Sequence, residues 1–170
     1  DESVAAVAAR RGVPIAEGWI DQALELDGRR MFVLPFLNQQ MDEAADMLRR
    51  PYVVLGLADA GAHSKQIMDA SQPTFFLTHW VRDRGEFSIE EAVRLMTSDT
   101  ADLFSIPDRG RLAPGSFADV NVHDMEGLRL GYPEMAHDFP GGAGRLVQRA
   151  DGSTEVGRAP GGECVWISAG

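Results

Sequence analysis

The segment from Tyr52 to His63 constrains the fold more than any other part of the chain. Its sequence, YVVLGLADAGAH, starts as an apolar run and breaks into a turn that carries Asp59 and, four residues later, His63. A continuous apolar run is typical of a strand buried on both faces, as in parallel sheets covered by helices. In such folds, ligands and catalytic residues lie in the loop after the carboxyl end of a strand. Asp59 is therefore a candidate metal ligand or proton acceptor.

The order of the predicted elements favours a parallel α/β fold. Helices are expected from Ser3 to Gly12, around Trp19 to Gly28, after Asn38, from Ser88 to Met96 and from Ser98 to Phe104, and strands at 31–34 and 52–58. The helix after Ser88 has the clearest signal, because Ser88 and Glu91 form a capping box ahead of an apolar stripe. Alternating strands and helices indicate parallel architecture, but two strands are too few for a complete parallel sheet.

The composition changes at Pro107. Residues after it are rich in Gly and Pro, with short apolar pieces at 117–122 and 144–147. Such a pattern predicts short strands and loops, and so a small β unit. We therefore expect residues 1–107 to form one part of the protein and residues 108–170 another.

Charge and composition exclude several classes of partner. The net charge of -10 over 170 residues argues against nucleic acid and against an anionic membrane surface as main partners. No apolar run approaches the ~20 residues that a membrane helix needs. The lone Cys164 excludes an internal disulfide framework. Because the chain starts at Asp1 with neither Met nor a signal peptide, we expect a piece of a longer protein, with a cytoplasmic location as the default.

The histidines form no metal-binding motif by themselves. His-x-His, His-Glu-x-x-His and Cys-x-x-Cys are all missing from the sequence, so a metal centre needs ligands from elsewhere. A histidine placed as His63 is more often a structural hydrogen-bonding group than a metal ligand, and Asp59 is also compatible with a simple turn. His79 lies in the apolar segment 75–82, where we expect a packed element with a hydrogen-bonded imidazole. His123 and His137 are expected to be exposed.

Together these segments resemble the carboxyl-terminal part of a metal-dependent amidohydrolase of the D-aminoacylase (N-acyl-D-amino-acid deacylase) family. The central match is GLADAGAH, which is similar to that family's Ser-Asp-Ala-Gly-Ala-His segment. Further segments match in the same order along the chain, and this order makes the resemblance far more specific than any single motif. They are residues 77–85, 88–93, 97–104, 108–115, 118–120 and 138–145.

The resemblance implies a (β/α)₈ TIM-type barrel followed by an appended β domain, of which this chain holds the last part. It implies one or two zinc ions and an N-acyl-D-amino acid as substrate. Asp59, matched to the Asp after the last barrel strand, would ligate metal or carry the proton from a metal-activated water to the departing amine. His63 would support the loop. The other metal ligands would come from the missing amino-terminal part of the same protein, so this chain alone should be inactive.

Two departures and two alternatives accompany this interpretation. Ala58 stands where the family has Ser, and the residues after Arg149 do not follow the usual family ending. A cyclic-amide hydrolase, similar to a hydantoinase or dihydroorotase, would share the barrel and the role of the Asp. A non-catalytic structural or association domain, with Asp59 as a turn residue, is the other alternative.

Overall fold

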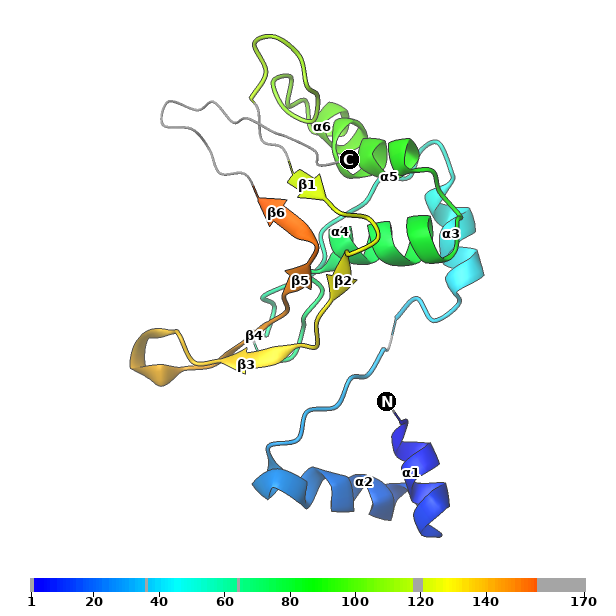
Figure 1. The fold of residues 1–170 in the computed structure, drawn as a ribbon, viewed down its shortest axis with the longest axis vertical. Coiled ribbons are helices and arrows are strands. Elements are labelled where there is room, and N and C mark those ends of the chain that lie inside the picture. Colours follow the sequence, from blue (N-terminus) through cyan, green and yellow to red (C-terminus); the bar gives the residue numbers. More distant parts are fainter. Residues whose placement is uncertain (1, 36, 64, 118–120, 156–170) are drawn as a thin grey trace. The chain divides into compact units, whose positions relative to one another are not determined.

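The computed structural model describes residues 2–35, 37–63, 65–117 and 121–155 (Figure 1). The chain divides into two compact units, Asp1–Met41 and Asp42–Gly170. Each unit has its own packed helices, and the strands all belong to the second unit. Within the described part of the chain, no helix is long and apolar enough to cross a membrane.

The first unit is a helix pair. Helix α1 (Val4–Arg11) begins at Ser3, whose side chain accepts a hydrogen bond from the Ala6 N–H at 3.1 Å, and ends at Gly12 in the left-handed conformation (φ 70°). These are the predicted cap and stop. Helix α2 (Ile15–Leu24) packs against α1 at Gly18, where an added Cβ would lie 2.7 Å from the Ala8 Cβ. Only glycine allows this close approach.

The next two predicted helix boundaries are wrong. Helix α2 ends at Leu24, and the short 3₁₀ segment η1 (Glu25–Gly28) contains Leu26 and Asp27 at positive φ, so the α-helix does not reach Gly28. Asn38 also has a positive φ of 52°, whereas an N-cap residue is extended. Helix α3 (Met41–Leu48) starts three residues later, with the predicted apolar stripe intact.

The second unit has an aromatic core built on a long helical segment. Helix α4 (Gln72–Phe75) continues into η2 (Phe76–Asp83), a rare π-helical stretch. The ring of Phe87 lies 5.2 Å from that of Phe76 and 6.3 Å from that of Trp80. Helices α5 (Ile89–Met96) and α6 (Ser98–Leu103) follow, and Ala92 and Leu95 of α5 are buried.

An ion-pair network covers the edge of this core. The Glu86 carboxylate accepts hydrogen bonds from Arg49 and, at 3.0 Å, from Arg84, and Arg84 also pairs with Asp42. These hydrogen bonds, with that from Arg49 the stronger, lower the pKa of Glu86. The Arg49 guanidinium lies 5.2 Å from the centre of the Phe87 ring. Because Arg49 directly follows α3, the network fastens α3 to the loop after η2.

The strands form three antiparallel pairs that are nested in sequence. Strand β1 (Asn121–His123) pairs with β6 (Ser153–Glu155), β2 (Arg129–Leu130) with β5 (Ala150–Asp151), and β3 (Glu134–Ala136) with β4 (Arg145–Val147). The pairs follow one another along a single arm, so they are rungs of one interrupted hairpin (Figure 1). The short 3₁₀ segment η3 (Pro140–Gly142) lies in its end loop. Strand β4 confirms the strand predicted at 144–147.

Arg82 of η2 links the hairpin to the helices by hydrogen bonds. Its Nη1 donates to the Met125 carbonyl at 3.2 Å and to the Leu128 carbonyl, and Leu128 is fully buried. The predicted boundary between residues 107 and 108 lies between α6 and β1 and stays a prediction. Of the strand predicted at 117–122, only the last two residues are in β1, and residues 118–120, which also carry part of the family resemblance, lie outside the described residues.

The two strands predicted for the barrel are not strands here. Residues 30–35 and 53–59 belong to no helix or strand. The apolar side chains at 31–34 are exposed, with Val33 at 77%, and so is Leu57 at 84%, whereas those at 53–55 are partly buried. A strand requires a neighbour that pairs with its backbone, and the described part of the chain offers none. The described residues accordingly form a mixed helix and strand fragment without a closed barrel.

The capping box at α5 gives a stability prediction. The Ser88 hydroxyl accepts a hydrogen bond from the Glu91 N–H at 3.1 Å, and the Glu91 carboxylate accepts one from the Ser88 N–H at 2.8 Å. We expect Ser88→Ala to lower the free energy of unfolding by about 1 kcal/mol, measured by urea titration. Ser71→Ala is the matched control, because Ser71 precedes α4 without making a side-chain cap. Equal losses in the two variants would contradict a capping role for Ser88.

Candidate functional site

The candidate site is the turn that carries Asp59 and His63. The Ala62 N–H donates to the Asp59 carbonyl at 3.0 Å, and the Gln66 N–H donates to the His63 carbonyl at 2.6 Å. Asp59, Gly61 and His63 all have positive φ, at 53°, 88° and 51°. Such a conformation is uncommon outside glycine, although Asp and His adopt it more readily than most residues. The sequence prediction of a turn at this position is confirmed.

Both candidate side chains of this turn, Asp59 and His63, are exposed. Neither the Asp59 carboxylate nor the His63 imidazole makes a hydrogen bond or an ion pair with another described residue. The Asp59 carboxylate is therefore free to accept a proton or to bind a cation. Its catalytic role and the supporting role of His63 remain predictions.

The described residues do not by themselves fit a zinc ion. Among them, no three His, Cys, Asp or Glu side chains are grouped so that they could hold a metal. A zinc site in a hydrolase usually has three protein ligands and an open position for water. The Asp59 carboxylate is chemically suited to be one of these ligands, and that the remaining ligands lie outside this chain stays a prediction.

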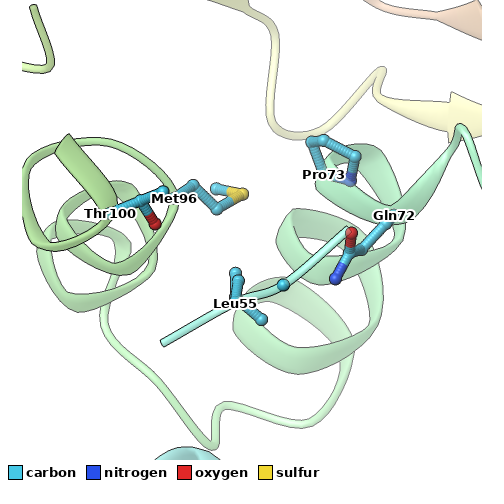
Figure 2. A pocket seen from close by; sticks show the side chains of 6 residues that line it. Leu55, Gln72, Pro73, Met96 and Thr100 are labelled. Atoms are coloured by element: carbon cyan, nitrogen blue, oxygen red, sulfur yellow. The ribbon is translucent and has the colours of Figure 1, made fainter. Parts of the chain in front are cut away.

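A small pocket that the sequence did not predict lies beside the segment leading to Asp59 and is lined in part by it. It has a volume of about 200 Å³ and is lined by Leu55, Gly56, Gln72, Pro73, Met96 and Thr100. Figure 2 shows these side chains around it, with Met96 reaching from α5 toward Leu55 and Pro73. Apolar atoms make up most of the lining. The hydroxyl of Thr100, one of its polar groups, donates to the Leu95 carbonyl at 3.0 Å. The pattern of α5 marks Met96 as a core residue but gives no signal for a cavity.

His79 is packed as predicted but is not hydrogen-bonded. Its ring stacks on Phe75 with the centroids 4.7 Å apart, and the Nε2 atom is buried without a partner in the described structure. Burial, and to a smaller extent Arg84, lower the pKa of His79, while Asp83 raises it. The predicted exposure of His123 and His137 is confirmed.

Comparison with known proteins identifies the family and several partial relatives. The model of the amidohydrolase family matches residues 2–148. An uncharacterized protein of Mycobacterium tuberculosis is 29% identical over 97% of this chain, which corresponds to 28% of that protein. The chain thus spans little more than a quarter of the length of this relative. No solved structure matches this chain.

Two named enzymes match shorter stretches of the chain. A D-aminoacylase of Alcaligenes xylosoxydans xylosoxydans is 48% identical over 48 residues, 28% of this chain and 10% of the enzyme. A dihydroorotase of Lactobacillus johnsonii is 36% identical over 52 residues, 31% of this chain and 12% of the enzyme. Each of these stretches covers less than a third of this chain. The family match, in contrast, covers most of the chain, which therefore belongs to the amidohydrolase family.

Proposed function

We propose that the parent protein of this chain is a zinc-dependent hydrolase that cleaves the amide bond of N-acyl-D-amino acids, with Asp59 as its proton shuttle. The observation that carries the proposal is the exposed Asp59 carboxylate, free of partners among the described residues, on a turn within the family match. The D-aminoacylase similarity supports this choice of substrate.

The chemistry assigned to Asp59 is proton transfer. As water attacks the acyl carbon of the substrate, an Asp59 Oδ atom takes up a proton from the water. The same proton then passes to the amide nitrogen of the substrate as the C–N bond breaks. The products are a carboxylic acid and a free amino acid, and Asp59 ends ionised as it began. A carboxylate performs this step only within hydrogen-bond reach of the water. Zinc would supply Lewis acidity in the parent, held by ligands outside the described residues.

We further propose that the amino-terminal part of the same protein completes the fold. The exposed apolar residues Tyr52 (82%), Leu57 (84%) and Leu34 (77%) support this, because strands buried on both faces have this composition. The backbone of residues 54–58, which makes no backbone hydrogen bond with another described residue, is suited to receive neighbouring strands. The 28% coverage of the Mycobacterium tuberculosis relative leaves ample chain for such a partner.

The test is a substrate panel with the parent protein. We expect hydrolysis of N-acetyl-D-amino acids, measured as release of the free amine, and loss of that activity after zinc is removed by a chelator. N-acetyl-L-amino acids serve as matched controls that differ only in configuration. Turnover of dihydroorotate or hydantoin in place of the N-acyl substrates would overturn the proposal in favour of a cyclic-amide hydrolase. The similarity to a dihydroorotase supports that alternative.

A further inference from the structure

One buried polar group of the second unit takes no part in the candidate site. The His79 imidazole lies between two aromatic rings: it stacks on Phe75 at an interplanar angle of 12° and meets Trp80 edge-on, with centroids 4.9 Å apart. Its Nε2 atom is buried and has no hydrogen-bond partner among the described residues. Leaving a buried acceptor unpaired costs free energy, and leaving a buried charged group unpaired costs more. An imidazolium carries a proton on both nitrogens, so protonation turns the unpaired acceptor into an unpaired charged donor.

This histidine is directly coupled to the aromatic core. Trp80, which it touches, is only 4% exposed, and the Trp80 ring meets the Phe87 ring edge-on. The Arg84 guanidinium already lies 5.3 Å from the centre of the Trp80 ring. A positive charge on His79 would therefore be repelled by the Arg84 guanidinium beside the same tryptophan, and it would bury an N–H without an acceptor among the described residues.

The charges around His79 do not compensate for its protonation. Burial has the largest effect and, together with Arg84, opposes the charged form and lowers the pKa of His79, while Asp83 favours the charged form without cancelling them. Helix α5, which packs against η2, carries Glu90, Glu91 and Arg94, and strand β2 near α4 carries Arg129. None of these four charges contributes to the lowered pKa of His79.

We propose that His79 is an acid-sensitive latch of the core formed by Phe76, Trp80 and Phe87. In its neutral form it closes the stack between Phe75 and Trp80. On protonation it leaves the stack to reach water, and Trp80 loses its perpendicular contact with the imidazole ring. The device acts on the packing of η2, not on the chemistry of Asp59, so it is independent of the proposed function.

The sign of the pH dependence follows from the direction of the pKa. The unfolded imidazole has a pKa of about 6.5, and that of folded His79 is lower. Above pH about 6.5 both states are neutral, and the latch contributes its full stability. As the pH falls from there through the folded pKa, the unfolded state binds the proton first and stability is lost. At a pH below the folded pKa, each unit of difference between the unfolded and the folded pKa of His79 lowers the ratio of folded to unfolded protein tenfold.

The experiment compares the whole 170-residue chain with two variants. Urea midpoints are measured between mildly alkaline and mildly acidic pH, on both sides of about 6.5, for wild type, His79→Phe and His137→Phe, where Phe keeps a ring and removes the titration. We expect the midpoint of wild type and His137→Phe to fall with acid, and that of His79→Phe to fall less. Equal pH dependence in all three proteins would overturn the proposal.

A second measurement needs no variant at that position. The His79 ring protons are followed by NMR against pH in the wild-type chain, together with the Trp80 indole N–H. We expect an apparent pKa below the ordinary histidine value of about 6.5 and a Trp80 shift with the same midpoint. A His79 pKa at or above that ordinary value, or a Trp80 resonance indifferent to it, would contradict the latch.

Discussion

Asp59→Asn in the parent protein is expected to lower kcat by a factor of about 10²–10⁴, the usual contribution of a positioned proton-transfer group. Asparagine has nearly the shape of aspartate but cannot accept and return the proton. It also tolerates the positive φ of this position, at 53°, so the turn should persist. The measurement is steady-state kinetics on an N-acetyl-D-amino acid, and we expect a much smaller change in KM.

The matched control is Asp69→Asn, which alters another exposed carboxylate in the segment between Asp59 and α4. It makes the same chemical change in the same part of the chain, and its kcat should stay close to that of wild type. Zinc content should be measured in both variants, because loss of metal in Asp59→Asn alone would assign Asp59 to ligation. Unchanged turnover with unchanged zinc in Asp59→Asn would refute a catalytic role and favour Asp59 as a turn residue.

Helices with local start and stop signals were predictable from the sequence. Helix α1 depends on Ser3 and Gly12, and α5 on Ser88 and Glu91, all within a few residues of the helix they cap. Their hydrogen bonds involve neighbours in sequence, so no knowledge of the remaining fold is needed. Boundaries without such signals, such as the end of α2 at Leu24, were not predicted.

The apolar runs at 31–34 and 52–58 show the limit of this reasoning. Their composition is that of buried strands, but strand pairing depends on partners far away in sequence. The described residues contain antiparallel partners only within 121–155, so neither run is paired. The nested hairpin itself was predicted only as short strands, because its registers depend on contacts between distant residues, such as Asn121 with Glu155.

For the candidate site, the sequence predicted the turn but not its environment. The position of Asp59 after an apolar run and before Gly61 follows from residue types alone. The pocket near Leu55 arises where that segment meets α4, α5 and α6, an arrangement that no local pattern encodes. The unpaired His79 Nε2 arises within the helical segment of α4 and η2, where the ring packs on two aromatic side chains. Metal ligation by Asp59 stays a prediction, because among the described residues no three potential ligands are grouped around a metal position.

Gly152→Ala is expected to destabilise the nested hairpin strongly, because the added methyl group would collide with backbone. Gly152 has a φ of 78°, and an added Cβ would lie 2.6 Å from the backbone carbon of Gly127 and from the backbone nitrogen of Leu128. Backbone atoms cannot move aside as the end of a side chain can, and Leu128 is fully buried. The Gly152 carbonyl also accepts a hydrogen bond from the Asp124 N–H at 2.9 Å, which this displacement would strain.

The matched control separates the clash from the cost of a positive φ. Gly85 has a φ of 62°, and an added Cβ there would meet nothing within 4 Å. Gly85→Ala should therefore show only the conformational cost, about 1–2 kcal/mol. Gly152→Ala should add the cost of overpacking, about 1–3 kcal/mol more. Urea unfolding of the two variants measures the difference, and equal losses would mean that the close contact between Gly152 and the backbone at Leu128 does not support the hairpin.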